Sequence, residues 1–352
     1  MKLHLVALPH TRVDHEFCHC AYTSKVLKFC KMMKGWEIFL YAPEGKEEKV
    51  EGATLISCLS NSDRINTFGA DVPGRLPAWP TDKQSEQFNT AVISPLSNLY
   101  ERGDLVLLAG GRTHKPITDA LPTALFCEPF VGYEGILTGL CAFESYAWMH
   151  YVYGKNNIAD IRWFDTVVPP FVDVDDFPVR NDGKGEYLAF LGRRIERKGL
   201  RVAAEIANLA DLPLIVAGAG NLKVDIGNVR YLGPIDVAER AKFLAGARAL
   251  LVPTFYCEPG GNVVLEAMAC GTPVIAPDFG VMSETVIDGV TGFHFRLLHE
   301  AVRAVEKVQD LVPSVIQRHA LGYSLSATRP RFSKWFKRLE TLFSNGWYTK
   351  AA

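Results

Sequence analysis

Segments that have the composition of buried strands alternate with amphipathic helical segments along most of the chain, and this alternation is what most restricts its fold. In the first half the strand candidates are 3–8, 36–42, 54–58, 105–109 and 123–127. Several are apolar at every position, which is typical of parallel strands covered on both faces. Helical patterns fall near 22–34, 85–100, 115–121 and 140–153. The polar stretches 44–52 and 61–84 are expected to be loops.

The alternation of strand and helix patterns is interrupted near the middle of the chain and then resumes. The segment 154–163 is polar, and VVPPFVDVDDFP at 167–178 brings prolines and acids that favour an extended connector. Further strands are expected at 187–191, 213–217, 229–232, 249–253 and 273–276, with helices at 200–209, 237–245 and 262–270. A chain of 352 residues is too long for one ordinary core. We predict two Rossmann-like α/β domains, 1–165 and 166–328, that face one another across a cleft at their strand carboxyl ends.

Composition excludes some classes of protein. The net charge of -1 gives no global attraction to nucleic acid or to an anionic membrane. No apolar run reaches the ~18 residues of a spanning helix, so we expect no stable membrane insertion. The start MKLHLVALPH lacks a secretory pattern, and the eight cysteines lack a disulfide rhythm, which favours a cytoplasmic protein with reduced thiols. His15, Cys18, His19 and Cys20 are spaced too closely for a zinc knuckle, so no metal is expected.

Fixed positive charge follows the strand at 187–191. Arg193 stands just past that strand and Lys198 follows five residues later, directly before a helix. Arginine offers a planar fork of donors and lysine a point charge, a combination that suits two adjacent phosphates. Cations at a helix amino terminus oppose the helix dipole, and a bound anion removes that conflict. The sequence favours an anion site here, with further cationic candidates at Arg194, Arg197 and Arg201.

A glycine turn follows the strand at 249–253. Pro259, Gly260, Gly261 and Asn262 open the helix VVLEAMAC, whose free amides and dipole attract phosphate. Glycine lets a ligand approach the backbone closely. Glu258 precedes the turn and Glu266 lies about one helical turn beyond it. If phosphate binds the turn, the two carboxylates flank it and can accept hydrogen bonds from a sugar on either side.

These motifs carry a resemblance to a known family. The pattern is GRRIERKG, then Gly218-x-Gly220, then two glutamates eight residues apart, then AMACGTPVI and DFGVMSETVIDGVTGF. It resembles the family 4 retaining glycosyltransferases over about 165–295, and more loosely elsewhere. The resemblance implies the GT-B fold and transfer of a sugar from a UDP- or GDP-sugar without a metal cofactor.

The resemblance also implies roles for individual residues. Arg193 and Lys198 neutralise the donor diphosphate, Glu266 holds the ribose, and Glu258 binds the transferred sugar near the reacting centre. Gly261 and Asn262 offer backbone amides, and Leu232 to Pro234 lie against the nucleobase. The remaining donor-side candidates are Gly218, Gly260 and Val263. Many relatives have an aromatic residue where this chain has Gly260, which leaves the preferred donor sugar open.

The acceptor is expected to bind the N-terminal domain. Glu128 follows the strand at 123–127 and is expected to face the cleft, where a carboxylate can position or deprotonate a hydroxyl. His114 is the rival candidate, and Tyr133 and His10 come next. The acceptor can be a glycan, a lipid, a small molecule or a modified base. FESYAWMHYVYG at 143–154 is interpreted as a packed aromatic helix.

The last segment, 329–352, begins with a helical pattern that places Phe332, Trp335, Phe336, Leu339 and Phe343 on one apolar stripe. It can belong to the second domain's own core, but in GT-B enzymes the last helix crosses back to the first domain.

Three other functions remain open at this stage. A GT-B epimerase would convert the nucleotide-sugar without an acceptor. A non-catalytic module would bind the nucleotide alone. An enzyme acting on modified nucleic-acid bases would need a local basic patch, for which Lys25, Lys28, Lys31 and Lys34 are candidates. Their spacing of three drifts round the helix, so a solvated face is the favoured interpretation.

Overall fold

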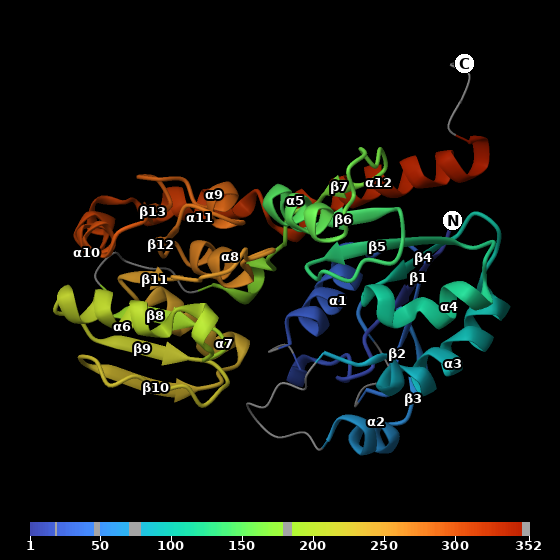
Figure 1. The fold of residues 1–352 in the computed structure, drawn as a ribbon, viewed down its shortest axis with the longest axis horizontal. Coiled ribbons are helices and arrows are strands. Elements are labelled where there is room, and N and C mark those ends of the chain that lie inside the picture. Colours follow the sequence, from blue (N-terminus) through green and yellow to red (C-terminus); the bar gives the residue numbers. More distant parts are fainter. Residues whose placement is uncertain (18–19, 46–49, 70–78, 179–184, 347–352) are drawn as a thin grey trace.

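Two parallel sheets form the framework of the protein (Figure 1). The computed structural model describes residues 1–17, 20–45, 50–69, 79–178 and 185–346. The first sheet has seven strands in the order β3-β2-β1-β4-β5-β6-β7, and the second has six in the order β10-β9-β8-β11-β12-β13. This confirms the prediction of two Rossmann-like α/β domains.

The strands of both sheets are short and mostly buried. Those of the first are β1 (Leu3–Val6), β2 (Ile38–Pro43), β3 (Thr54–Leu59), β4 (Leu105–Leu108), β5 (Leu125–Val131), β6 (Cys141–Phe143) and β7 (Thr166–Val167). Those of the second are β8 (Leu188–Leu191), β9 (Leu214–Ala217), β10 (Val229–Gly233), β11 (Ala249–Leu251), β12 (Val274–Pro277) and β13 (Gly292–Phe295). Every strand expected from the sequence is present, and inner strands of both sheets, such as β4 and β8, are continuous apolar runs.

Helices connect the strands and cover the sheets. They are α1 (Ala21–Met32), α2 (Asn61–Phe68), α3 (Asp82–Leu99), α4 (Lys115–Ala120), α5 (Tyr146–Lys155), α6 (Leu200–Leu209), α7 (Val237–Ala245), α8 (Asn262–Ala269), α9 (Met282–Thr285), α10 (Leu298–Lys307), α11 (Pro313–Leu321) and α12 (Leu325–Asn345). Within the described ranges, none of them is both long and apolar enough to cross a bilayer.

Two expectations from the sequence, a helix at 140–153 and a loop over 61–84, were wrong. The helix expected at 140–153 is a strand followed by a helix, because Ala142 pairs with Thr166 of β7 and Ser145 then caps α5 by accepting from the Trp148 amide. The loop expected over 61–84 contains α2, which Ser60 caps through the Asp63 amide. The part of that loop at 70–78, and the part of the 44–52 loop at 46–49, lie outside the described residues.

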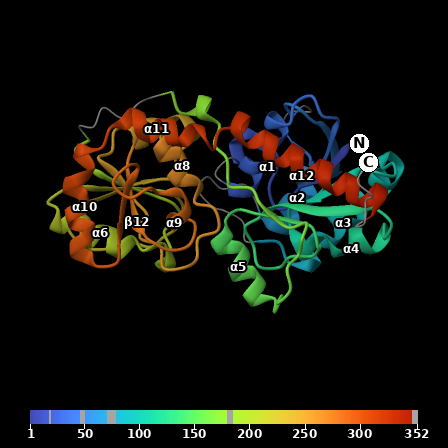
Figure 2. The same ribbon diagram turned by 90° about the horizontal axis from the view of Figure 1, so that it is seen from above.

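The last helix packs against the first domain. Figure 2 shows α12 running along that domain, beside α1. The rings of Phe332 and Phe29 meet edge to face with centroids 5.3 Å apart, and Trp335 and Phe336 are buried in the same cluster. Trp335 also donates from Nε1 to the Phe164 carbonyl at 2.8 Å. The apolar stripe therefore completes the core of the N-terminal sheet.

Truncating this stripe is expected to unfold the N-terminal domain more readily. Phe336→Ala removes a side chain that is fully buried between α1 and the sheet, and such changes lower the free energy of unfolding by about 3–5 kcal/mol. Lys337→Ala, on the exposed side of the same helix, is the control and is expected to change it by less than about 0.5 kcal/mol. Urea denaturation followed by circular dichroism measures both. Equal effects of the two variants would show that the stripe does not contribute to the core.

Candidate active site

The carboxyl ends of the second sheet bring the sequence motifs together. Arg193 follows β8, Gly218 follows β9, Pro234 follows β10, and the turn at Glu258 follows β11. These four strands are neighbours in the order β10-β9-β8-β11. Because parallel strands end at the same edge, segments separated by up to 65 positions along the chain meet there.

A pocket of about 140 Å³ opens at this edge. Most of its lining comes from the C-terminal domain, while Ala21 and Ser24 contribute from the first turns of α1. The rest of the lining is Leu191, Gly192, Arg193, Gly218, Ala219, Pro234, Ile235, Arg240, Asn262, Val263 and Glu266. The pocket therefore lies between the two domains.

Three buried polar atoms in this pocket have no hydrogen-bond partner among the described residues. They are Glu266 Oε2, Asn262 Oδ1 and Arg240 Nε. Buried polar groups are nearly always satisfied, and an unsatisfied one calls for a specific reason. Three of them on one pocket wall indicate a site built for a polar ligand.

Glu266 and Arg240 form an ion pair on this wall. Arg240 Nη1 donates to Glu266 Oε1 at 2.7 Å, and the two side chains are only 13% and 7% exposed. The pair orients the Glu266 carboxylate and leaves its other oxygen without a partner among the described residues, so that it can accept from a ligand hydroxyl. Arg240 was not predicted from the sequence. It lies in the segment AERAKF, whose charged residues are typical of a solvent-exposed helix, and no motif distinguishes it from its charged neighbours.

A second ion pair joins the two charged motifs. Lys198 Nζ donates to Glu258 Oε2 at 2.6 Å, with side chains 19% and 13% exposed. The ring of Tyr256 lies beneath Lys198, whose Nζ is 5.1 Å from the ring centroid. Burial and the neighbouring Glu258 raise the pKa of Tyr256, so its hydroxyl stays protonated. The cation expected to meet a phosphate and the carboxylate expected to meet a sugar are thus in direct contact.

The glycine turn presents the amino terminus of α8 to the pocket. Gly261 caps this helix with φ 61°, a left-handed conformation that L-residues rarely adopt. Asn262 and Val263 follow as its first residues and line the pocket. Their amides have no partner within the helix, so they are available to an anion.

The predicted donor-side residues do not all take the same position. Those on the pocket lining are Arg193, Gly218, Pro234, Asn262, Val263 and Glu266. Lys198, Glu258, Gly260 and Gly261 are beside it in the flanking turns. Leu232 is 54% exposed at the outer end of β10 and is not on the lining.

The N-terminal domain holds the turn from its other side. Ser145 Oγ donates to the Pro259 carbonyl at 2.8 Å. Glu284 of α9 accepts from the amides of Tyr146 and Ala147, at 3.0 and 2.7 Å. These amides begin α5, so a carboxylate of one domain compensates the helix dipole of the other.

Glu128 does not face the cleft as expected. Its side chain is fully buried, and both of its oxygens accept hydrogen bonds within the domain. Oε1 accepts from the amides of Leu137 and Thr138 at 2.8 and 2.6 Å, and Oε2 accepts from the Tyr133 hydroxyl at 2.8 Å. Burial raises the pKa of Glu128. Glu128 therefore fixes the 133–138 loop, and its geometry argues against direct contact with an acceptor.

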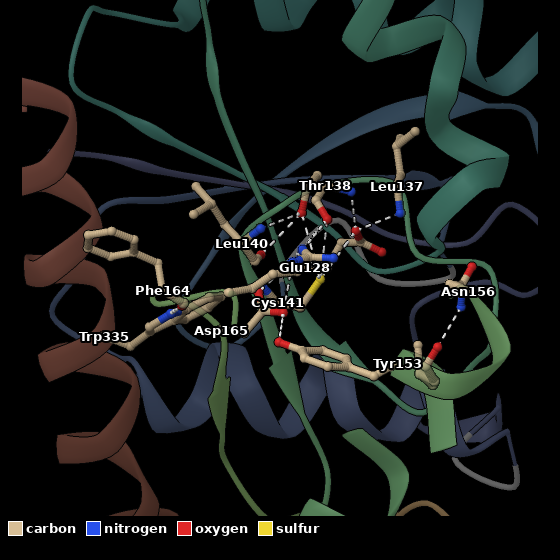
Figure 3. Close-up of polar contacts among 12 residues, drawn as sticks. Glu128, Leu137, Thr138, Leu140, Cys141, Tyr153, Asn156, Phe164, Asp165 and Trp335 are labelled. Carbon is tan, nitrogen blue, oxygen red and sulfur yellow. Dashed lines mark hydrogen bonds and ion pairs between the residues drawn. The ribbon is translucent and has the colours of Figure 1, made fainter. Parts of the chain in front are cut away.

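Figure 3 shows a second carboxylate in this network. Asp165 accepts from the Cys141 amide at 2.8 Å and from the Tyr153 hydroxyl at 2.8 Å, and it pairs with Arg162. Burial raises the pKa of Asp165 to about 6. These contacts tie α5 and the connector to β6, which places Ser145 beside the turn of the other domain.

The other acceptor-side candidates lie at different depths. His114, in the turn after β4, is fully buried, and burial lowers its pKa to about 3, so it is neutral at pH 7. His10 is 5% exposed, with Nε2 3.4 Å from Cys20 Sγ. Tyr133 lies nearer the surface, where its ring centroid is 5.5 Å from that of Trp79. Cys18 and His19, the other part of the rejected metal cluster, lie outside the described residues.

The lysines of α1 do not form a solvated basic face. Lys25 is buried against Glu144, Lys28 donates to the Phe171 carbonyl, and Lys31 pairs with Asp173. Of the four, Lys34 alone is well exposed, at 70% of its side chain, and it pairs with Glu51. The expected solvated face was wrong because the connector brings its own acceptors to this helix. A nucleic-acid-binding role for the patch therefore has no support.

Comparison with known proteins finds similarity to glycosyl transferases. Residues 172–324 match the family model described as "Glycosyl transferases group 1". The phosphatidyl-myo-inositol mannosyltransferase of Propionibacterium freudenreichii subsp. shermanii is 31% identical over 163 residues, 42% of each chain. The protein of that name from Mycolicibacterium smegmatis is 28% identical over 300 residues, 76% of this chain and 75% of its own. The match thus spans about two fifths of the first relative's length and three quarters of the second's.

Solved structures share the whole architecture at low sequence identity. Sucrose-phosphate synthase from Thermosynechococcus elongatus aligns with a TM-score of 0.69 at 16% identity, covering 96% of this chain and 99% of its own. Anabaena HepE, solved in complex with UDP and glucose, aligns with a TM-score of 0.68 at 14% identity, covering 96% and 99%. Residues 172–324 therefore match the group 1 glycosyl transferases, and the whole chain shares the two-domain fold of these solved structures.

Proposed function

We propose that the protein is a retaining glycosyltransferase that moves a sugar from a nucleoside-diphosphate sugar to an acceptor hydroxyl. The observation that carries the proposal is the group of unsatisfied polar atoms on one pocket wall, Glu266 Oε2, Asn262 Oδ1 and Arg240 Nε. A ribose supplies the hydroxyl donors that Glu266 and Asn262 lack, and an oxygen of the ligand accepts from Arg240. The C-terminal domain binds the donor and the N-terminal domain binds the acceptor.

The diphosphate is placed between the two charged motifs. Arg193 reaches it from the end of β8, the α8 amides of Asn262 and Val263 from the opposite wall, and Lys198 from the side of Glu258. When the sugar–phosphate bond breaks, negative charge develops on the diphosphate oxygen. Fixed cations and amides stabilise this charge without reorganising during the reaction.

The transferred sugar lies toward Glu258. Glu258 is held by Lys198, so one side chain contacts the phosphate while its partner accepts from a sugar hydroxyl. Retention of the anomeric configuration is carried over from the resemblance of the two-glutamate motif. The curated relatives are named as mannosyltransferases and HepE was solved with UDP-glucose, so UDP- and GDP-hexoses are the donors we propose.

The acceptor is proposed to be a polyol, a glycan or the head group of a lipid. The relatives' name specifies phosphatidyl-myo-inositol, a lipid whose head group offers several hydroxyls. On the N-terminal domain, the aromatic rings of Tyr22, Trp79 and Tyr133 group together, with centroids 4.9 to 6.1 Å apart. Trp79 is 40% exposed, so this group offers a stacking surface to a sugar-like ring.

The reaction is tested by incubating the protein with UDP-glucose, UDP-galactose, UDP-N-acetylglucosamine and GDP-mannose, with and without myo-inositol, glucosides and phosphatidylinositol vesicles. We expect release of UDP or GDP that depends on an acceptor, and a product that keeps the donor's α-configuration by NMR. Conversion of a donor to another nucleotide-sugar without an acceptor would indicate an epimerase instead. Binding of UDP or GDP without any turnover would indicate a non-catalytic module.

Glu266→Gln is expected to weaken binding of UDP or GDP about 10- to 100-fold. The change removes the charge that pairs with Arg240 and accepts from the ligand, and hydrogen bonds to charged groups contribute about 1.5–3 kcal/mol. Isothermal titration calorimetry measures the dissociation constant. Glu306→Gln, an exposed carboxylate on α10, is the matched control and is expected to bind as the wild type does. Unchanged affinity in Glu266→Gln would remove it from the site.

Lys198→Met is expected to lower kcat about 10²–10³-fold, because one donor to the departing diphosphate is lost. Its effect on the dissociation constant for UDP or GDP is expected to be smaller, since charge on the leaving oxygen is greatest in the transition state. Steady-state kinetics with the best donor of the panel measure both quantities. Lys242→Met, an exposed lysine on α7, is expected to keep full activity. Wild-type kcat in a folded Lys198→Met protein would contradict this role.

A further inference from the structure

A buried ion pair lies outside the residues assigned to the proposed site. Lys25 of α1 donates from Nζ to Oε1 of Glu144, the residue that follows β6. The two side chains are only 5% and 6% exposed. Removing two charges from water is costly, and a buried ion pair is weak evidence for stability. The pair therefore invites a functional explanation.

The Glu144 carboxylate fills the space between two glycines, one from each domain. A Cβ on Gly132 would lie 2.8 Å from Glu144 Oε1, and a Cβ on Gly260 would collide with Glu144 Oε2. Neither glycine has the left-handed φ that would by itself require glycine. Contact with this carboxylate, rather than backbone conformation, thus explains why both positions lack a side chain.

The carboxylate has a fixed place over the proposed donor-binding turn. Gly260 is two residues after Glu258 and directly precedes Gly261, the cap of α8. Ser145, the next residue after Glu144, donates to the Pro259 carbonyl at 2.8 Å. Backbone and side-chain contacts therefore hold Glu144 against the turn.

Lys25 places the pair next to the two residues of α1 that line the pocket. Ala21 and Ser24 line the pocket, and Lys25 follows Ala21 by one turn on the same face of α1. Burial and the neighbouring charge of Lys28 lower the pKa of Lys25 to about 7, and the charge of Glu258 partly opposes this shift. The ion pair and the proposed sugar-binding carboxylate are thus within electrostatic reach of one another.

One oxygen of the pair is available. Lys25 occupies Glu144 Oε1, and Oε2 has no hydrogen-bond partner among the described residues. Ionised carboxylate oxygens accept hydrogen bonds and cannot donate them. The group best suited to this oxygen is a hydroxyl.

We propose that Glu144, oriented by Lys25, is a specificity-determining residue for the transferred sugar, and that its Oε2 accepts a hydrogen bond from one sugar hydroxyl. The inference rests on the proposed function. It specifies that the donor carries a free hydroxyl at the end of the sugar that meets Gly260. A donor without that hydroxyl leaves the carboxylate oxygen unpaired in the complex, which is the kind of mismatch that binding sites reject most strongly.

The test compares donor selectivity, because a merely structural role would lower activity with every donor equally. The probes are the best donor of the panel and its 2-, 3-, 4- and 6-deoxy analogues, assayed with wild type, Glu144→Ala and Glu144→Gln. We expect the wild type to discriminate about 10- to 100-fold in kcat/KM against one deoxy analogue. In Glu144→Ala that ratio is expected to fall below about threefold. Affinity for UDP or GDP alone is expected to stay at the wild-type value.

A second pair of variants tests the contact itself. Gly260→Ala is expected to lower kcat/KM more than tenfold in the wild-type background, where the new Cβ meets the carboxylate. The same change in Glu144→Ala is expected to lower it less than threefold. If Glu144→Ala does not fold, Glu144→Gln keeps the shape of the side chain and is expected to show a reduced selectivity ratio.

The outcomes separate the two proposals. If the wild type turns over none of the donors and binds neither UDP nor GDP, the proposed function fails, and this inference fails with it. If the wild type is active but no deoxy ratio changes in either Glu144 variant, the inference alone is overturned. A uniform loss across all donors would likewise assign the ion pair to structure.

Discussion

The turn from Glu258 to Asn262 is held from both domains at once, and the arrangement of the site depends on this. Lys198 binds Glu258 from the β8 side, and Ser145 Oγ binds the Pro259 carbonyl from the N-terminal domain. Glu284 adds a carboxylate beneath the first amides of α5. Because the turn also opens α8, whose amides face the pocket, a change in the relation of the domains moves the groups that bind a ligand. The interface and the site are one structural unit.

Two buried ion pairs near this turn have the same arrangement. Glu266 pairs with Arg240 and Glu144 pairs with Lys25, in each case through Oε1. Among the described residues, Glu266 Oε2 is buried without a hydrogen-bond partner, whereas Glu144 Oε2 lies against Gly260. In each pair the basic side chain compensates the charge of a buried carboxylate, which would be costly to bury alone. We propose that the second oxygen of each carboxylate accepts a hydrogen bond from the ligand. Carboxylates held in this way suit ligands rich in hydroxyls, such as sugars.

Local sequence was enough to predict the architecture and the motifs that meet at the carboxyl edge of the second sheet. Strands such as Leu105–Leu108 are fully apolar, and the glycine turn with Glu258 and Glu266 has a fixed spacing on one helix start. The direction of individual side chains depends on tertiary contacts, which local sequence does not reveal. Glu128 follows its strand as expected, yet the amides of the 137–138 segment turn back onto it and draw it inside. Side-chain direction at a strand end depends on the next loop, and no local pattern encodes that.

Arg240 and Glu144 are site candidates that local sequence patterns did not reveal. Arg240 has the sequence context of a solvated helix residue, and Glu144 lies in a segment that resembles a packed aromatic helix. Each side chain is held by a partner distant in the sequence: Arg240 by Glu266, and Glu144 by Lys25. In the structure, Gly132 and Gly260 mark the place of Glu144, since neither has a left-handed backbone and a side chain at either position would meet the carboxylate. Glycines of this kind are explained by close contact with a neighbouring group and not by the conformation of a turn. Here the neighbouring group is the Glu144 carboxylate, which lies between the two domains.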